Sequence, residues 1–403
     1  MTSLAEVRRR PGMTRGAAFL FALAAGAAVG NLYWAQPVLG TIGDELGTTT
    51  DTAGLLITLT QVGYAVGVFF LVPLGDVVDR RILAPAFMLL AAVLLGAAAL
   101  APTFPALLVL LALVGASTVS GQLLAPLAGD LATEEQRGRV LGVVASGVLL
   151  GIMVARAVSG VVTDLVGWRA LYATVAVVML LLALTLYRVL PRLEPRARVG
   201  YGALLASVLR TTANADVRRL GLVGAAAMAT FTLYWTGLTF TLSDEPFGLS
   251  GAQIGLLNLV GISGALAAQY VGRLHDRGLA VPAIGVGLAV ALAAFVVAGV
   301  APGSIVAVVV SIALYSAGVQ SVLVLVQARV MAVDPSARSR LNTVFVVGNF
   351  VGGTIGSAVA SALWGLRPWG LGGWPVLMIA AGVLLLPAGL GWAGLRRNAV
   401  RAR

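Results

Sequence analysis

Long apolar runs follow one another along almost the whole chain, separated by short segments rich in arginine, glycine, proline or acidic residues. A helix needs roughly 20 apolar residues to cross the hydrocarbon core of a bilayer. The pattern therefore predicts an all-α membrane protein with twelve transmembrane helices. The predicted spans are 16–40, 52–74, 82–101, 104–128, 140–163, 168–190, 218–243, 250–271, 279–300, 303–330, 341–365 and 373–395.

The first half of the sequence recurs in the second half at a constant offset. Leu-Tyr-Trp at 32–34 recurs at 233–235, 201 residues later. Internal repeats in a membrane chain are typical of transporters whose binding site lies between two related halves. We expect two pseudo-symmetric six-helix bundles, 1–190 and 218–403, joined by a cytoplasmic linker at 191–217. Further repeats at the same offset are Arg139, Gly147 and Gly151, which recur as Arg340, Gly348 and Gly352.

Composition agrees with a membrane protein and argues against an enzyme. The chain is 59% hydrophobic and only 11% charged, too little polar surface for a domain dissolved in water. Cysteine is absent, which excludes disulfides and thiolate chemistry, and the single histidine, His275, cannot build a metal cluster. We therefore expect no enzyme, no cofactor and no metal.

The net charge of +11 comes from arginine alone, because lysine is absent. The arginines lie in the segments that would face one side of the membrane, apart from Arg156, Arg169 and Arg367. Such asymmetry is the signature of the cytoplasmic side of a membrane protein. It predicts cytoplasmic termini and gives no reason to expect a nucleic-acid partner.

Local motifs give the chain a family resemblance. Gly75-Asp76-Val77-Val78-Asp79-Arg80 follows the second span, and Gly272-Arg273-Leu274-His275-Asp276-Arg277 follows the eighth. With twelve spans, these motifs resemble the major facilitator superfamily. The first span, with Asn-Leu-Tyr-Trp-Ala-Gln-Pro at 31–37, is similar to bacterial permeases of the drug:proton antiporter and predicted arabinose-efflux type. The resemblance implies a monomeric carrier in the bacterial inner membrane that exports a small organic molecule by alternating access, coupled to protons.

The chain departs from the family pattern at three places. Arg80 is followed by Arg81 and Ile82, where the signature normally continues with Gly-Arg-Lys. Leu111 stands where the fourth helix normally has an arginine, and Arg156 stands where the antiporter signature of the fifth helix has a proline.

Arg156 is the one charge that the sequence places deep inside a span, toward the outer side. An arginine at the membrane centre costs about 2.5–3.5 kcal/mol on insertion scales, so it should face protein or water and have a partner. One interpretation is a cavity residue that binds an anionic substrate, for export or, alternatively, for import of an organic anion. The other is a structural ion pair, or snorkelling toward Asp51 or Asp164.

No aspartate or glutamate lies in the middle third of any predicted span. Proton-coupled carriers usually need a titratable group that is exposed to each side in turn. Proton antiport is thus implied by the resemblance and weakly supported by the residues. Facilitated export, and coupling through the protonation of the substrate itself, remain alternatives. A non-transporting sensor or scaffold is disfavoured, because no loop is long enough for a soluble domain.

Neutral polar and aromatic side chains within the spans are candidates for the substrate site. The resemblance implies that the first, fourth, seventh and tenth helices line the cavity. Any one of these groups could instead serve as a hydrogen bond between helices. With Arg156, the predicted substrate-binding residues are Asn31, Tyr33, Trp34, Gln36, Gln61, Tyr64, Gln122, Arg156, Tyr234, Trp235, Asn258, Gln320 and Asn349.

Charged residues at the cytoplasmic helix ends are candidates for a gate. An Asp-Arg pair at a helix end can bond its neighbours in one conformation and release them in another. The alternative is ordinary loop charge. Glycines four apart, such as Gly63 and Gly67, predict close helix packing or a sliding interface between the halves. The predicted gating residues are Gly75, Asp79, Arg80, Asp130, Arg137, Arg139, Gly272, Asp276 and Arg277.

Overall fold

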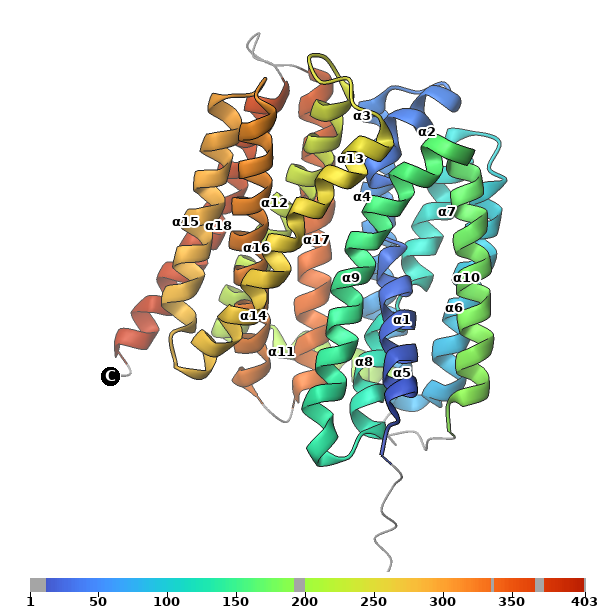
Figure 1. The fold of residues 1–403 in the computed structure, drawn as a ribbon. Helices are drawn as coiled ribbons and strands as arrows, with labels where there is room; N and C mark the ends of the chain where they lie inside the picture. The colour runs from blue at the N-terminus through green and yellow to red at the C-terminus, as the bar shows by residue number, and fades with distance from the viewer. Residues whose placement is uncertain (1–11, 192–199, 335–336, 367–372, 402–403) are drawn as a thin grey trace, which may run out of the picture.

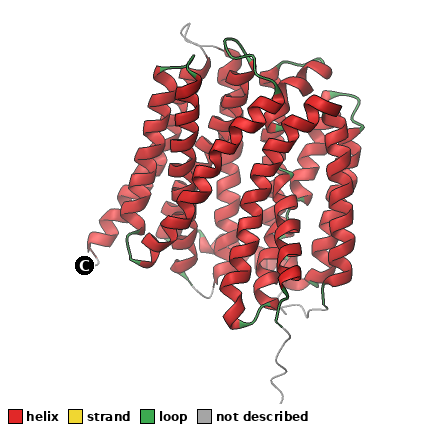
Figure 2. Ribbon diagram, in the orientation of Figure 1, coloured by secondary structure: helices red, strands yellow, loops and turns green. Residues whose placement is uncertain are grey.

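The computed structural model describes residues 12–191, 200–334, 337–366 and 373–401, and in these ranges the regular elements are helices (Figures 1 and 2). Eleven helices are long and apolar enough to cross a membrane by length and composition. The remaining crossing is made by a shorter apolar helix, Arg15–Gly30, together with the irregular segment that follows it. The arginines before Gly12, and Arg367, lie outside the described residues.

The first half of the chain builds six crossings. Several of them are interrupted: η1 and α2 continue the path of α1, while α7 and α8 form the fourth crossing together. The elements are α1 (Arg15–Gly30), η1 (Gln36–Val38), α2 (Leu39–Glu45), α3 (Thr50–Ala53), α4 (Leu55–Leu71), α5 (Leu74–Val77), α6 (Arg80–Ala99), α7 (Phe104–Ser117), α8 (Ser120–Leu131), α9 (Glu134–Val166) and α10 (Trp168–Val189).

The second half builds six more crossings, preceded by a short helix in the linker, α11. The Tyr201 hydroxyl of that helix, α11, donates a hydrogen bond to the carbonyl of Phe70 at the end of α4. The elements are α11 (Tyr201–Thr211), α12 (Ala215–Ser243), α13 (Gly251–Leu257), η2 (Asn258–Gly261), α14 (Ile262–Asp276), α15 (Ala280–Val300), α16 (Ile305–Val333), α17 (Arg338–Leu366) and α18 (Gly373–Arg401).

The two ends of the bundle carry opposite charge. We call the end with Glu45, Asp164 and Asp244 the acidic end, and the end with Arg80 and Arg137 the basic end. Helix α1 begins and α18 finishes at the basic end (Figure 1). The outer helices between the two ends expose large apolar side chains, for example Val93 at 62% and Leu181 at 57%, as a surface in contact with lipid does.

The first crossing is broken where the sequence predicts one continuous span over 16–40. After Gly30 the backbone tightens, and the amides of Asn31, Leu32 and Tyr33 donate to carbonyls three residues back. Pro37 has no amide hydrogen, and its ring clashes with the carbonyl four residues earlier in a regular helix. At the equivalent place, 201 residues later, Leu238 lies inside the continuous helix α12. Pro37 therefore disfavours a regular helix here, and the second half has no proline at the equivalent place.

Small residues bring neighbouring helices into backbone contact within each half. A side chain on Gly151 or Gly147 of α9 would collide with the backbone of α1. A side chain on Gly63 or Gly67 would likewise meet α7, and one on Gly352 would meet α12. The close-packing interpretation of the glycine spacing therefore holds, and the interpretation of these glycines as a sliding interface between halves is wrong.

The two halves contact each other most closely toward the acidic end. There α9 packs on α13, with the backbones of Gly160 and Gly251 in contact, while α4 packs on α17. The carboxylate of Asp164 accepts a hydrogen bond of 2.9 Å from the amide of Ala252, in the first turn of α13. Farther along, α14 packs against α16 of its own half. The interface thus places the middle of α9 against residues of the second half.

Candidate functional site

Arg156 lies in α9 at the interface between the halves, and its side chain is almost fully buried, with 5% of the residue exposed. Its Nε donates a hydrogen bond of 3.0 Å to Oε1 of Gln36, in the broken part of the first crossing. Three aromatic rings surround the guanidinium carbon, with centroids 4.8 Å away for Tyr33, 5.1 Å for Phe231 and 4.3 Å for Trp235. Both halves therefore build the surroundings of this one cation.

The charge of Arg156 is not balanced by a carboxylate in the described part of the chain. Its Nη2 is buried without a hydrogen-bond partner, and no ion pair joins it to Asp51 or Asp164. Asp164 instead bonds the amide of Ala252. The interpretation of Arg156 as half of an ion pair with either residue is wrong. The aromatic faces attract the cation but leave its hydrogen-bonding capacity open.

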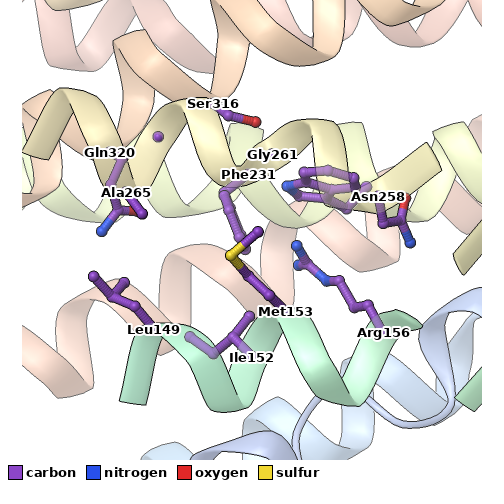
Figure 3. Close-up of a pocket in the computed structure, with 12 residues that line it drawn as sticks. Leu149, Ile152, Met153, Arg156, Phe231, Asn258, Gly261, Ala265, Ser316 and Gln320 are labelled. Atoms are coloured by element: carbon purple, nitrogen blue, oxygen red, sulfur yellow. The ribbon is translucent and has the colours of Figure 1, made fainter. Parts of the chain in front are cut away.

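A small cavity of about 60 Å³ lies beside Arg156. Figure 3 shows Leu149, Ile152, Met153 and Arg156 extending from α9 toward residues of the other half. Pockets that hold drug-sized ligands are usually about 300–1,000 Å³, so this cavity is too small for such a ligand. A larger solute therefore needs more room between the halves than this conformation offers. The residues lining it from the second half are Phe231, Trp235, Asn258, Gly261, Gly264, Ala265, Ser316 and Gln320.

Most of the unpaired polar groups near this cavity are hydrogen-bond donors. Buried atoms without a partner include Nη2 of Arg156, Nε2 of Gln36 and Nε1 of Trp235. The hydroxyl of Ser316 can donate or accept, and Oδ1 of Asn258 accepts. Unpaired buried polar atoms are rare in folded proteins and are costly. A site with excess donors and one unbalanced cation matches a ligand rich in acceptor oxygens, such as a carboxylate.

Five of the predicted substrate-binding residues therefore meet around Arg156 or line its cavity. Tyr33, Gln36 and Trp235 contact Arg156 directly. Asn258 and Gln320 line the cavity.

Three other predicted substrate-binding residues lie at a second place between the halves. The Tyr64 hydroxyl accepts a hydrogen bond of 3.0 Å from Gln122, and Gln122 accepts one of 3.4 Å from Asn342 of α17. Gln61 is buried near Gly353, also on α17. These contacts join the halves between Arg156 and the basic end.

The remaining predicted substrate-binding residues lie away from the cavity. Nε1 of Trp34 donates to Oδ1 of Asn31 at 3.1 Å, a bond internal to the broken segment. The Tyr234 ring stacks on Tyr315 at 4.4 Å inside the second half, with its hydroxyl 2.6 Å from Ser311. Asn349 lies against Gly224 of α12. In this conformation these side chains support the helices that hold the site.

The predicted gate is partly assembled at the basic end. Arg80 is 9% exposed; it donates to the carbonyl of Gly75 at 2.6 Å and pairs with Asp130 at 3.5 Å. Asp79 caps α6 by accepting from the amide of Arg81 at 2.9 Å. Arg80 and Asp130 thus connect the second and fourth crossings, and the role of this pair as a gate stays a prediction.

The other predicted gating residues are not part of this latch as described. Arg137 lies beside Gly129 of α8, and Arg139 lines a separate pocket with α1. Arg277 is exposed. Gly272 and Asp276 belong to α14, but the surroundings of these two residues lie outside the described part of the chain.

The structure adds site residues that the sequence interpretation did not select. Phe231 precedes Trp235 by four positions and so shares its helix face, a signal that the sequence did contain. Met153 and Ile152 are ordinary apolar residues of α9 and carry no such signal. Asn342, at the start of the eleventh crossing, bonds Gln122 across the interface.

The chain is similar to transporters over most of its length. A model of the family described as Major Facilitator Superfamily matches residues 18–356. "Uncharacterized transporter YgaY" of Escherichia coli O157:H7 is 35% identical over 381 residues, which are 94% of this chain and 95% of that protein. "Chloramphenicol resistance protein" of Streptomyces lividans is 29% identical over 242 residues, 59% of this chain and 60% of that protein.

A solved structure shows the same fold. It is a bacterial homologue of the human lysosomal transporter Spinster in an inward-facing, unoccupied conformation, with a TM-score of 0.74 and 17% identity. The match covers 96% of this chain and 97% of that one. At this identity the likeness concerns the fold, and it confirms the predicted twelve helices in two six-helix bundles.

Proposed function

The chain belongs to the Major Facilitator Superfamily and is a multi-pass secondary transporter, and from this premise we propose that it exports a small organic molecule with a carboxylate or similar anionic group. Arg156 binds the anionic group, and the aromatic rings around it bind the apolar body of the molecule. The observation that carries this proposal is the buried guanidinium with a free Nη2 and no carboxylate partner among the described residues.

Alternating access about this site is the proposed mechanism. The site lies between the halves, and its cavity of about 60 Å³ is too small for a drug-sized solute in this conformation. The bundles at 1–190 and 218–403 therefore rock against each other about the linker at 191–217, opening the site first to one end and then to the other. The basic end faces the cytoplasm of a bacterial inner membrane, in accordance with its arginines.

Export is proposed as the direction because of the resemblance to efflux permeases and because a relative is named a chloramphenicol resistance protein. Import of an organic anion is the second candidate. The unbalanced charge of Arg156 favours an anionic substrate and does not distinguish import from export. Proton antiport is a separate prediction that the family resemblance implies. The described residues give it little support, since the only charged side chains buried among them are arginines, Arg80 and Arg156.

Paired ligands that differ only in charge test the role of Arg156. Purified protein is screened by thermal shift with benzoate and benzamide, phenylacetate and phenylacetamide, and further acid–amide pairs. We expect acids but not their amides to stabilise the wild type, and Arg156→Gln to abolish that stabilisation. Arg188→Gln, which removes an exposed charge at the end of α10, is the matched control and should behave as the wild type. Equal stabilisation of wild type and Arg156→Gln by acids would overturn the proposal.

Direction and coupling are tested with the acid that this screen selects. Everted membrane vesicles should accumulate it if the carrier exports, whereas accumulation by right-side-out vesicles would establish import. The export assay is then repeated with the pH gradient collapsed. Undiminished export would refute proton antiport and leave facilitated transport.

A further inference from the structure

A second pocket, of about 390 Å³, lies at the basic end between the starts of α1 and α9. The two helices lie side by side there, and the residues that line the pocket all belong to the first half (Figure 1). Gln136, Arg139, Val140 and Val143 face the pocket from α9; their spacing of three, four and seven residues makes one helix face. Arg15 and Phe19 face it from α1.

The pocket is cationic and lacks an internal counter-charge. Arg15 and Arg139 are both exposed, and neither has an ion-pair partner in the described part of the chain. Oε1 of Gln136 is buried there without a hydrogen-bond partner. The nearest carboxylate in sequence, Glu135, is hydrogen-bonded to Thr133 at the start of α9. Water screens the repulsion between two exposed guanidiniums, so both can stay at one pocket, and guanidiniums match phosphate oxygens well.

The pocket continues into an apolar strip that runs toward the membrane centre. Phe19 is 66% exposed, and Leu23, one turn farther along α1, is 48% exposed. On α9, Leu150 follows Val143 by two turns and is 62% exposed. At 1.5 Å per residue the strip extends roughly 10 Å beyond the pocket, most of the depth of one leaflet of about 15 Å. A cationic pocket at the end of an apolar strip is complementary to an amphiphile with an anionic headgroup.

We propose that this pocket binds an anionic phospholipid of the leaflet at the basic end. The phosphate lies between Arg15 and Arg139, and an acyl chain lies along Phe19, Leu23 and Leu150. A soluble anion would use the arginines but not the apolar strip, so the strip selects the lipid. The argument for this lipid site does not rest on the proposed transport function.

The lipid would hold together the two helices that build the Arg156 site. Arg156 projects from α9, while Tyr33 and Gln36 follow directly after α1. The helices pack through the backbones of Gly26 and Gly151, with no long side chain to lock them at this crossing. A lipid that bridges their starts restrains their relative position, and so the geometry of the bond between Arg156 and Gln36.

Native mass spectrometry with defined lipids tests the site. Detergent-purified protein is titrated with 1-palmitoyl-2-oleoyl phosphatidylglycerol and, separately, with the phosphatidylcholine of the same chains. We expect one phosphatidylglycerol to be retained about tenfold or more tightly than phosphatidylcholine, the order expected for two arginines near an anionic lipid. Arg15→Gln combined with Arg139→Gln should remove this preference. Arg188→Gln combined with Arg210→Gln, two exposed arginines in α10 and α11, should keep it.

Two further measurements separate a lipid from a soluble anion. Phe19→Asn should weaken phosphatidylglycerol binding several-fold and leave unchanged any binding of glycerophosphoglycerol, the soluble headgroup. The proposal is overturned if the Arg15/Arg139 variant retains the preference, if the two lipids bind equally, or if glycerophosphoglycerol competes as well as the intact lipid. If the double variant does not fold, Phe19→Asn and the headgroup competition still decide the question.

Discussion

Replacing each of the two buried arginines by methionine should have very different effects on stability. Arg156 and Arg80 are exposed to similar degrees, 5% and 9%, but only Arg80 pairs with a carboxylate, Asp130. Removing Arg156 relieves a burial cost of about 2.5–3.5 kcal/mol. It removes a charge-assisted hydrogen bond to Gln36 worth about 1.5–3 kcal/mol and a cation–π contact with Trp235 worth about 0.5–2 kcal/mol. These terms nearly cancel.

Arg156→Met should therefore change the free energy of unfolding of the empty protein by no more than about 1 kcal/mol. Arg80→Met leaves Asp130 without this partner, and breaking a buried pair costs about 3–5 kcal/mol. The Asp130 side chain is 17% exposed, and the Arg80 nitrogen lies 3.5 Å from its carboxylate oxygen. We therefore expect the free energy of unfolding to fall by about 3 kcal/mol, the lower end of that range.

Unfolding in mixed micelles, titrated with sodium dodecyl sulfate and followed by tryptophan fluorescence, measures both variants against the wild type. A loss of stability in Arg156→Met as large as that in Arg80→Met would mean that Arg156 is a structural element of the fold. The argument for a ligand-binding arginine would then fail. If Arg156→Met has the stability of the wild type but is no longer stabilised by acids, the role of Arg156 is ligand binding.

Three other predictions follow from single contacts. Gln36→Leu removes the acceptor for Nε of Arg156 and should weaken binding of the selected acid about tenfold without changing the class of ligand, measured by titration calorimetry. Gly151→Leu forces a side chain into the backbone of Gly26 and should abolish folding or transport, whereas Gly142→Ala, with nothing within 4 Å, should be neutral in expression and uptake assays. Asp164→Ala removes the bond to Ala252 and should let the acidic end open. Because the chain has no cysteine, spin labels attached at Leu165→Cys and Val300→Cys should report an additional, longer distance between the halves. An unchanged distance distribution would show that Asp164 does not hold the halves together.

The architecture could be predicted from the sequence because it depends on local properties. The length of an apolar run determines whether a helix can span the bilayer, and the offset of 201 relates the two halves without any knowledge of contacts. The break in the first crossing was missed because the span was assigned by hydropathy alone. Pro37, where the other half has Leu238, contained the necessary signal.

The site could be predicted only in part. A local stretch of sequence shows that a residue lies inside a span, but it does not show which distant residues that residue contacts. Arg156 was found because a charge inside a span is expensive wherever it lies. Tyr234 was selected with its neighbour Trp235, but adjacent residues of a helix point about 100° apart, and the Tyr234 ring packs inside the second half instead. The bond from Asn342 to Gln122 joins residues 220 positions apart, which no local pattern relates.

The internal repeat loses its symmetry at the site, where two residues that are bonded to each other in the first half both have no equivalent in the second half. Arg156 corresponds to Ser357, and Gln36, which bonds Arg156, corresponds to Gly237; the second half lacks both members of the bonded pair. The tryptophans recur, but the indole N–H of Trp34 is satisfied by Asn31, whereas that of Trp235 is unpaired and its ring contacts Arg156. Helix packing alone gives no reason for one half to keep a buried cation and its acceptor while the other half has a serine and a glycine. A ligand between the halves gives such a reason, because one anionic group needs only one cation.

Moving the pair to the second half tests this argument. The variant carries Ser357→Arg and Gly237→Gln in an Arg156→Gln background, and it should not recover binding of acids. Leu377 occupies the space beside Gly237, and Ser357 bonds Thr58 rather than facing the Trp235 ring. Recovery in the thermal-shift screen would show that either half can supply the cation, and that the asymmetry is not what defines the site.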